Sequence, residues 1–249
     1  MPADSTMVTE IFSSIQGEGI FTGCRQIFIR FWGCNLNCRY CDTRTGKAPV
    51  HCRIETEPGT GNFCLLPNPL TAAEVALRAG ELNPSGHQTI SLTGGEPLLH
   101  TSFLSRLIPL LPPARQGIYL ETNGTLPEEL ARIIDGIDII AMDIKLPGTA
   151  GITPCWREHE AFLALALAKK KKVMVKIIIA DYSADREIEQ AVELLSRYKD
   201  IPVVLQPVSS SRGIPQLAPG RALAIQARAL EKLIDVRVIP QTHKYLHLL

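Results

Sequence analysis

The sequence has no apolar run long enough to cross a membrane. Its purest apolar runs, such as residues 177–180, are far shorter than the roughly 20 residues that a spanning helix needs. The first ten residues are polar and lack the apolar core of a secretory signal peptide. We therefore expect a cytoplasmic protein.

Neither sign of charge is in excess. The 26 lysines and arginines against 25 acidic residues give a formal net charge of +1, so nothing favours nucleic acid or acidic lipid as a partner. One basic run, residues 169–172, follows a predicted helix and precedes a predicted strand. Cations are favourable at a helix C-terminus, so we interpret this run as a solvated helix end. We expect no nucleic acid and no membrane among the partners.

The cysteines lack the second ligand pair of a structural zinc site. Cys34, Cys38 and Cys41 form a CxxxCxxC pattern, and no other cysteine or histidine pair has zinc-type spacing. Three thiolates suit a 4Fe-4S cluster in which one iron stays open to an outside ligand. A buried apolar cysteine cluster or a disulfide are the alternatives, and both are weak for three cysteines within eight residues.

The other four of the seven cysteines do not suggest a disulfide framework, because cytosolic thiols are normally reduced. Cys52 and Cys64 flank a Gly/Pro-rich stretch, residues 57–61, that predicts a turn between two extended arms. Such a hairpin could bring the two thiols together to bind an extra metal or to oxidise. Two incidental thiols in an insertion is the interpretation we favour.

Short β-branched runs alternate with periodic stretches along the chain. The predicted strands are residues 26–32, 88–92, 117–120, 137–142, 173–179, 203–205 and 236–238. The predicted helices are residues 102–111, 128–135, 158–169, 183–198 and 221–233, with one more that begins at the capping box of residues 71–74. Apolar strands alternating with helices indicate a parallel sheet.

Six or seven strands are too few for a closed eight-stranded barrel. We therefore expect an α/β fold, a partial, splayed parallel β/α barrel. Its 249 residues, 45% of them hydrophobic, can bury one substantial core, so we expect a single domain over residues 1–249. An insertion of about residues 46–69 interrupts it.

Polar motifs follow several predicted strands, at the edge where parallel sheets bind ligands. In residues 93–97, TGGEP, two glycines remove side chains where a ligand would approach the backbone. Residues 121–124 and 143–147 end the next two strands. An Asn-Gly turn would account for Asn123 but not for Glu121, and a surface ion pair would account for residues 143–147 nearly as well as a cofactor contact.

The CxxxCxxC pattern with Tyr40 before its last cysteine resembles the cluster loop of the radical S-adenosylmethionine (SAM) superfamily. In that superfamily the methionyl amine and carboxylate of SAM fill the open iron position. The resemblance implies a 4Fe-4S cluster and SAM as cofactors. It assigns cofactor contacts to Tyr40, Asp42, Gly94, Gly95, Glu96, Glu121, Asn123, Asp143, Lys145, Gln206 and Pro207.

Four further segments resemble the 7-carboxy-7-deazaguanine synthases: residues 10–19 with IQGEG, Arg30, the CDT triplet 41–43 and residues 240–244. The resemblance implies ring contraction of 6-carboxy-5,6,7,8-tetrahydropterin to 7-carboxy-7-deazaguanine with loss of ammonia, on the path to queuosine. It also implies Mg²⁺, a homodimer and an electron donor such as flavodoxin or ferredoxin.

The same resemblance assigns substrate contacts to Ile15, Gln16, Gly17, Arg30 and Thr93. Arg30 would hold the substrate carboxylate, a bidentate task that suits a guanidinium group. Thr43 would offer its hydroxyl to Mg²⁺, which takes few protein oxygens. His243 matches a family segment and has no assigned role.

Two departures from the family pattern affect these assignments. Many members carry Ser-Pro-Lys where this chain has Asp-Ile-Lys at residues 143–145, which leaves that cofactor contact open. The insertion at 46–69 directly follows Thr43, a position from which it could cover the active site or alter the substrate.

Two other functions are weaker. An activating enzyme for a glycyl radical protein would need neither IQGEG nor Arg30. A non-enzymatic metal-binding or nucleic-acid-binding module would need a second ligand pair or a basic face, and the sequence has neither.

Overall fold

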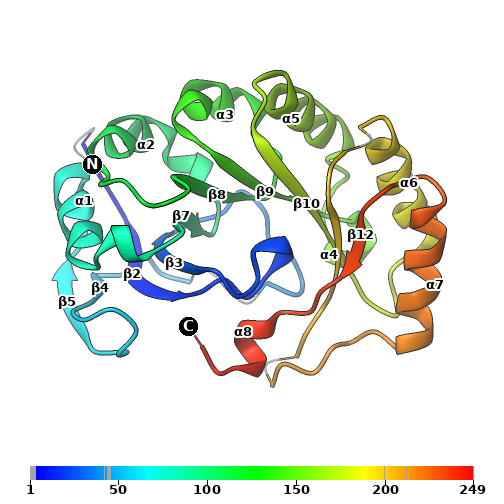
Figure 1. Cartoon of the computed structure of the whole chain (residues 1–249), viewed down its shortest axis with the longest axis horizontal. Helices are drawn as coiled ribbons and strands as arrows, with labels where there is room; N and C mark the ends of the chain where they lie inside the picture. The colour runs from blue at the N-terminus through cyan, green and yellow to red at the C-terminus, as the bar shows by residue number, and fades with distance from the viewer. Residues whose placement is uncertain (1–3, 42, 44–45, 199, 211, 249) are drawn as a thin grey trace.

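The computed structural model describes residues 4–41, 43, 46–198, 200–210 and 212–248. Its centre is a ten-stranded sheet in the order β12-β11-β10-β9-β8-β7-β3-β2-β4-β5 (Figure 1). The seven strands from β12 to β3 are parallel, which confirms the expected splayed β/α barrel. They are β3 (Arg25–Phe31), β7 (Thr89–Gly94), β8 (Ile118–Thr122), β9 (Ile139–Ile144), β10 (Lys172–Ile179), β11 (Val203–Pro207) and β12 (Val236–Val238).

The predicted helices cover the outer face of this sheet as an arc (Figure 1). They are α1 (Ala72–Glu81), α2 (Thr101–Leu107), α3 (Pro127–Ile133), α5 (Trp156–Ala168), α6 (Asp185–Ser196) and α7 (Pro219–Leu230). The short helices α4 (Pro147–Ala150) and α8 (Thr242–Tyr245) were not predicted. The capping box that begins α1 is present, because Thr71 Oγ1 accepts from the Glu74 amide and Glu74 accepts from the Thr71 amide. No helix within the described ranges combines the length and the apolar content needed to cross a bilayer.

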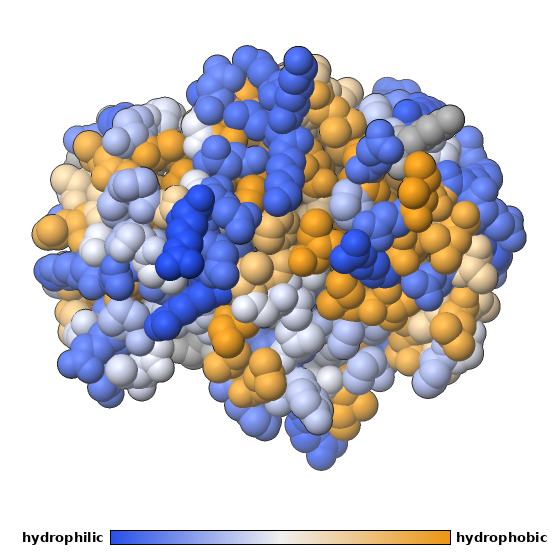
Figure 2. Space-filling model, viewed as in Figure 1, coloured by the Kyte–Doolittle hydropathy of each residue, from blue (hydrophilic) through white to orange (hydrophobic). Residues whose placement is uncertain are grey.

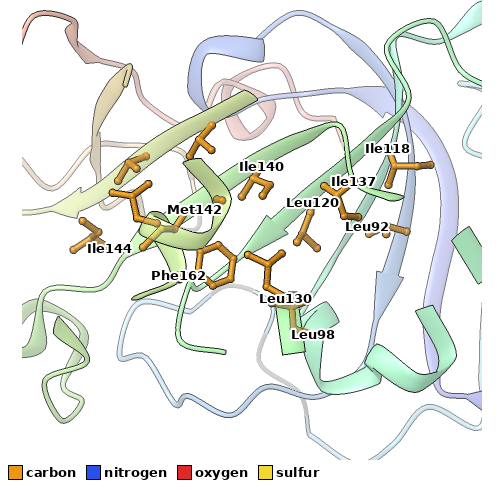
Figure 3. Packing of buried hydrophobic residues seen from close by; sticks show 14 of the residues in the cluster. Leu92, Leu98, Ile118, Leu120, Leu130, Ile137, Ile140, Met142, Ile144 and Phe162 are labelled. Atoms are coloured by element: carbon orange, nitrogen blue, oxygen red, sulfur yellow. The ribbon is translucent and has the colours of Figure 1, made fainter. Parts of the chain in front are cut away.

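Alternate residues of the parallel strands face two different environments. In β7, Ile90 and Leu92 belong to the main apolar cluster, whereas Thr89, Ser91 and Thr93 point to the other face. Figure 3 shows how the cluster continues across neighbouring strands to the helices, with Leu120, Ile140 and Met142 beside Phe162 of α5 and Leu130 of α3. The face of the sheet that points away from the helices is partly polar, and Thr93 at its edge lines the cavity described below.

The strand β2 (Val8–Ile15) is absent from the sequence-based prediction. Its apolar residues Val8, Ile11, Phe12 and Ile15 recur at helical spacing, which hides the alternation of a strand. A bulge between Val8 and Glu10 brings Val8 and Ile11 into the same apolar cluster, whereas Phe12 lies outside that cluster and stacks on Phe28 of β3. After the bulge, β2 pairs regularly with β3 in the antiparallel sense.

Residues 46–69 contain the predicted hairpin, β4 (His51–Glu55) and β5 (Phe63–Pro67), and β4 pairs with β2. Cys52 lies opposite Leu66, and Cys64 lies opposite Ile54, so the two thiols occupy a diagonal rather than a direct pair. Both are free, Cys52 buried and Cys64 exposed. Beside the hairpin, β1 (Ser5–Thr6) pairs with β6 (Leu70–Thr71) in a two-stranded sheet.

The C-terminal segment leaves the helical layer after β12. Figure 1 shows α8 near the blue N-terminal part of the chain, on the side of the sheet opposite the arc of helices. The Thr242 amide donates to the Gly17 carbonyl at 2.8 Å, so the last segment is fixed to the IQGEG loop.

The surface over α6 and α7 is rich in apolar side chains (Figure 2). Leu223 and Leu230 of α7 are exposed.

Candidate active site

One large cavity, of about 640 Å³, opens at the carboxyl ends of the parallel strands. It brings together predicted site residues that are far apart in sequence. Its lining includes Ile15, Gln16, Gly17, Arg30, Cys34, Cys38, Tyr40, Cys41, Thr43, Thr93, Gly94, Gly95, Glu121, Asn123, Asp143, Lys145, Gln206 and Pro207. Of the two remaining predictions, Glu96 is buried behind this lining, and Asp42 lies outside the described residues.

The cysteine loop follows β3 and is held by backbone hydrogen bonds. The Arg39 amide donates to the Ala150 carbonyl at 2.7 Å, and the Cys41 amide donates to the Cys38 carbonyl at 3.1 Å. The Leu36 amide points to the Cys34 sulfur at 3.4 Å, a contact that favours a thiolate at this atom. Burial raises the pKa of the Cys34 and Cys38 thiols, so each needs a metal or another positive charge to ionise.

The three cysteines of this loop offer the donors that a cluster takes. Among residues that the structure describes, no three cysteine, histidine or carboxylate side chains converge where one metal ion would sit. A 4Fe-4S cluster does not require such convergence, because its three thiolates bind three different irons. The three thiolates are therefore a donor set that suits a 4Fe-4S cluster.

The GGEP turn lies directly against the cysteine loop. The Glu96 amide donates to the Gly33 carbonyl at 2.7 Å, and the Gly95 amide donates to the Phe31 carbonyl at 3.1 Å. A Cβ atom at Gly95 would lie 1.8 Å from the Gly33 oxygen, so only glycine fits there. The turn thereby leaves backbone groups, rather than side chains, beside the cluster loop.

Glu96 connects two strand ends. Its carboxylate accepts from the Leu98 amide at 3.1 Å, from the Thr122 hydroxyl at 2.9 Å and from the Asn123 amide at 2.8 Å. Burial raises the pKa of Glu96 to about 7, although these three donors act in the opposite direction. Its direct contact with the cofactor stays a prediction, and its position makes it a brace between β7 and β8.

Asn123 links β8 to the cysteine loop. Its side-chain nitrogen Nδ2 donates to Asn35 Oδ1 at 2.8 Å and lies 3.8 Å from the Cys34 sulfur. The simple Asn-Gly turn considered from the sequence does not account for these contacts. Nearby, His159 Nε2 is 3.1 Å from the Asn123 carbonyl oxygen and supports the turn from α5.

Glu121 joins the residues predicted to bind substrate. Its two carboxylate oxygens accept from Gln16 Nε2 at 2.6 Å and from Thr93 Oγ1 at 2.5 Å. Gln16 also donates to Gln26, and its own oxygen accepts from the Glu18 amide at 3.0 Å. The sequence placed Glu121 with the cofactor, whereas its contacts group it with Gln16 and Thr93.

Arg30 lies in the cavity lining and is paired with an acid. Its Nε donates to Glu10 Oε1 at 2.8 Å, and its guanidinium carbon lies 5.6 Å from the centre of the Phe12 ring. Phe12 stacks on Phe28, opposite it on β3, with ring centres 5.1 Å apart. Arg30 thus lies in the cavity, and its contact with the substrate carboxylate stays a prediction.

A chain of alternating charges crosses the cavity wall. Lys145 binds Asp143 at 2.7 Å, the other Asp143 oxygen lies 3.1 Å from Lys176, and Lys176 also binds Glu18. The surface ion pair considered for Asp143 and Lys145 is wrong in its location, because both side chains are largely buried. Glu18 and Lys176 are site residues that the sequence analysis missed.

These charges stabilise one another in their ionised forms. Burial acts to lower the pKa of Lys145, but the Asp143 carboxylate outweighs it, and the pKa lies above the usual value. Burial acts to raise the pKa of Glu18, but Lys176 outweighs it, and the pKa lies well below the usual value. A single lysine within the apolar run 173–179 was the available signal for Lys176.

The C-terminal segment closes one side of the cavity. A Cβ at Gly17 would lie 2.3 Å from His243 Nδ1, so this glycine permits close packing of the two segments. Gln241 Nε2 donates to Glu18 at 2.8 Å and ties the segment to the charge chain. His243, which had no assigned role, lines the cavity.

Two buried polar atoms at the β10–β11 end of the cavity lack a protein partner. They are Gln206 Oε1 and the Tyr40 hydroxyl, counted over the described residues. Tyr40 packs against Ile178 and Val208, and Lys145 lies 5.8 Å from its ring centre. The unpartnered polar atoms fit a cofactor with hydrogen-bonding groups, and the apolar side chains around them fit a flat ring.

The chain is similar to proteins of known family. Residues 29–195 match the family model for the radical SAM superfamily. The 7-carboxy-7-deazaguanine synthase of Geobacter sulfurreducens is 42% identical, over 95% of each chain. That of Archaeoglobus fulgidus is 37% identical over 95% of this chain and 96% of its own.

Solved structures support the same fold. QueE from Escherichia coli aligns with a TM-score of 0.58 at 20% identity, over 95% of this chain and 94% of its own. The anSMEcpe protein with bound AdoMet aligns with a TM-score of 0.52 at 16% identity, over 82% of this chain and 58% of its own. At these identities the likeness concerns the arrangement of strands and helices.

Proposed function

The chain belongs to the 7-carboxy-7-deazaguanine synthase family of the radical SAM superfamily, and from this we propose the role of each part of its cavity. The reaction is the ring contraction of 6-carboxy-5,6,7,8-tetrahydropterin to 7-carboxy-7-deazaguanine with loss of ammonia. The observation that supports it most is one cavity that joins the three-cysteine loop to the Gln16–Glu121–Thr93 group.

The cofactor end of the cavity comprises the cysteine loop, the GGEP turn and the ends of β8, β9 and β11. Cys34, Cys38 and Cys41 would hold the 4Fe-4S cluster. When bound, the cluster and SAM supply the radical chemistry that removes a hydrogen atom from the substrate. The remaining side chains bind and orient SAM: Tyr40, Asn123, Asp143, Lys145, Gln206 and the backbone at Gly94, Gly95 and Pro207.

At the substrate end, Glu121 is proposed to receive the N–H edge of the pterin. An ionised carboxylate only accepts hydrogen bonds, and a pterin presents an amino group and a ring N–H side by side. The Gln16 and Thr93 side chains hold this carboxylate in one orientation. Ile15 and Gly17 contribute backbone groups beside it, and Arg30 binds the substrate carboxylate.

Mg²⁺ is proposed to bind Thr43, which lies in the cavity lining next to the cysteine loop. A hard ion with one protein ligand would take its other ligands from water and the substrate carboxylate. If so, turnover rises with added Mg²⁺, and Thr43→Ala weakens that response. A variant with the same Mg²⁺ dependence as the parent would place the metal elsewhere.

Three further proposals follow from the family and the sequence. The chain acts as a homodimer in the cytoplasm, and a small reductant such as flavodoxin or ferredoxin supplies the electron. The exposed apolar residues of α7, Leu223 and Leu230, support an association surface. Light scattering during gel filtration would measure the mass, and a monomeric mass at micromolar concentration would exclude the dimer.

The deciding experiment is an anaerobic assay of the reconstituted protein with the carboxylated tetrahydropterin, SAM, Mg²⁺ and a reductant. We expect 7-carboxy-7-deazaguanine, ammonia and 5′-deoxyadenosine to form together. Cleavage of SAM without consumption of the pterin would mean that the cavity serves another substrate.

A further inference from the structure

The inserted hairpin brings a second arginine to the cavity. Arg53 of β4 lines the cavity together with Arg30 of β3. Both bind Glu10 of β2, Arg30 through Nε to Oε1 at 2.8 Å and Arg53 through Nη1 to Oε2 at 3.2 Å. The two guanidinium groups therefore share one carboxylate, each on its own oxygen.

Each arginine is also fixed on a ring face. The Arg53 guanidinium carbon lies 4.2 Å from the centre of the Phe63 ring, which β5 supplies from the same hairpin. Arg30 lies 5.6 Å from the Phe12 ring centre. Several N–H donors remain available for a ligand. Among the described residues, the two η nitrogens of Arg30 have no hydrogen-bond partner, and neither do Nε and Nη2 of Arg53. The side chains are held in place while N–H groups stay available.

The group has an uncompensated charge. Two guanidinium groups and one carboxylate sum to +1, and the Glu10 side chain is only 11% exposed. Lys47, an exposed residue that also lines the cavity, adds to the positive side. A partly buried positive charge is stabilised by a bound anion, and a planar carboxylate matches guanidinium N–H pairs.

We propose that Arg53 is a specificity-determining residue, a second cation for the substrate carboxylate. This inference rests on the proposed function and assigns the inserted hairpin a part in choosing the substrate. Glu10 is the positioning residue, because it binds both arginines. A ligand with one negative charge neutralises the group, whereas a neutral analogue leaves it unbalanced. The site therefore selects carboxylated pterins over uncharged ones.

The effect of Arg53 should be smaller than that of Arg30. Its side chain is 46% exposed, against 22% for Arg30, so solvent screens its charge more. We expect Arg53→Gln to raise Kd and KM for the carboxylated pterin about tenfold, with kcat within about twofold of the parent value. Arg53→Lys keeps the charge and should recover part of the loss.

The experiment compares two ligands on the reconstituted enzyme: the carboxylated tetrahydropterin and its neutral 6-carboxamide. Equilibrium dialysis gives Kd for both, and steady-state kinetics give KM and kcat for the acid. Arg25→Gln is the matched control, because Arg25 of β3 contacts the same hairpin through the Pro58 carbonyl at 3.2 Å and does not line the cavity.

We expect Arg53→Gln to weaken binding of the acid and to leave binding of the amide unchanged, while Arg25→Gln changes neither. Equal weakening of both ligands, or an unchanged Kd for the acid, would overturn the role of Arg53. A parent protein that does not convert the carboxylated pterin at all would instead contradict the proposed function, so the two failures are distinguishable.

Discussion

The two ends of the cavity are built in different ways. At the cofactor end, the proposed cluster ligands come from one continuous segment, the cysteine loop, which the GGEP turn holds through backbone hydrogen bonds. At the substrate end, side chains from remote segments meet pairwise, as Gln16 meets Glu121 and Glu18 meets Lys176. A continuous loop suits a cofactor that stays the same. Where the side chains come from separate segments, a change of one residue can alter which substrate binds.

The sharpest test of this contrast is at the cofactor end. Cys34→Ala, Cys38→Ala and Cys41→Ala should each abolish SAM cleavage and reduce bound iron to background, because each removes one of the three thiolates proposed to hold the cluster. Iron analysis and the visible spectrum of the anaerobic protein measure this. Cys155→Ala, outside the loop, should keep the full cluster. A full cluster in any of the three loop variants would contradict the assignment.

At the substrate end, a substitution should reduce turnover of the pterin and leave SAM cleavage in place. Arg30→Ala removes a guanidinium group that is mostly buried, and we expect product formation to fall by roughly two powers of ten, which corresponds to about 3 kcal/mol. Slow SAM cleavage without product should persist, since Arg30 touches no proposed cofactor residue. Product and 5′-deoxyadenosine are measured side by side. Equal loss of both would mean that Arg30 supports the cluster or the fold.

The charge chain should matter for stability. Lys176→Met leaves Glu18 and Asp143 without their shared cation, and we expect the free energy of unfolding to fall by about 3 kcal/mol. Lys232→Met is the control, because its partner Glu193 is exposed and surface pairs contribute little, so its variant should stay within about 1 kcal/mol of the parent. Urea denaturation of both variants measures the difference. Similar values for the two would remove the special role of the buried chain.

A smaller effect should appear in how the free energy of unfolding depends on pH, through His159, which contacts the turn after β8. Burial lowers the pKa of His159 to about 4, so the unfolded chain binds a proton more readily than the folded one between that pH and the ordinary histidine range. Stability should therefore fall as pH decreases from about 6.5 to 4, by at most about 3 kcal/mol from this group. His159→Gln should flatten that part of the profile in urea denaturation at a series of pH values. An unchanged slope would assign the dependence to other groups.

The sequence predicted the parallel strands well and their ends less well. The cores of β7, β8 and β9 are apolar and were recognisable, but each strand continues into polar residues such as Thr93, Glu121 and Asp143. These residues look like turns in the sequence because the site needs their side chains. β2 was missed for a related reason, since its bulge next to Glu10 disturbs the alternation.

The site could be predicted where the chemistry is local. Three cysteines within eight residues and two adjacent glycines carry their own signal. Arg53 carries no such signal, and the lone lysine in the apolar run 173–179 marks position 176 without identifying its partner. Arg53 meets Glu10 through the register of β4 on β2, and Lys176 of β10 meets Glu18 of the loop that follows β2.

The contact between Gly17 and His243 ties one wall of the cavity to the C-terminal segment. A Cβ at Gly17 would lie 2.3 Å from His243 Nδ1, so any side chain at position 17 would push that segment away from the IQGEG loop. The hydrogen bond from Gln241 to Glu18 links the same two segments and would be disturbed by the same displacement. A substitution at Gly17 would therefore loosen this side of the cavity while leaving the cysteine loop untouched.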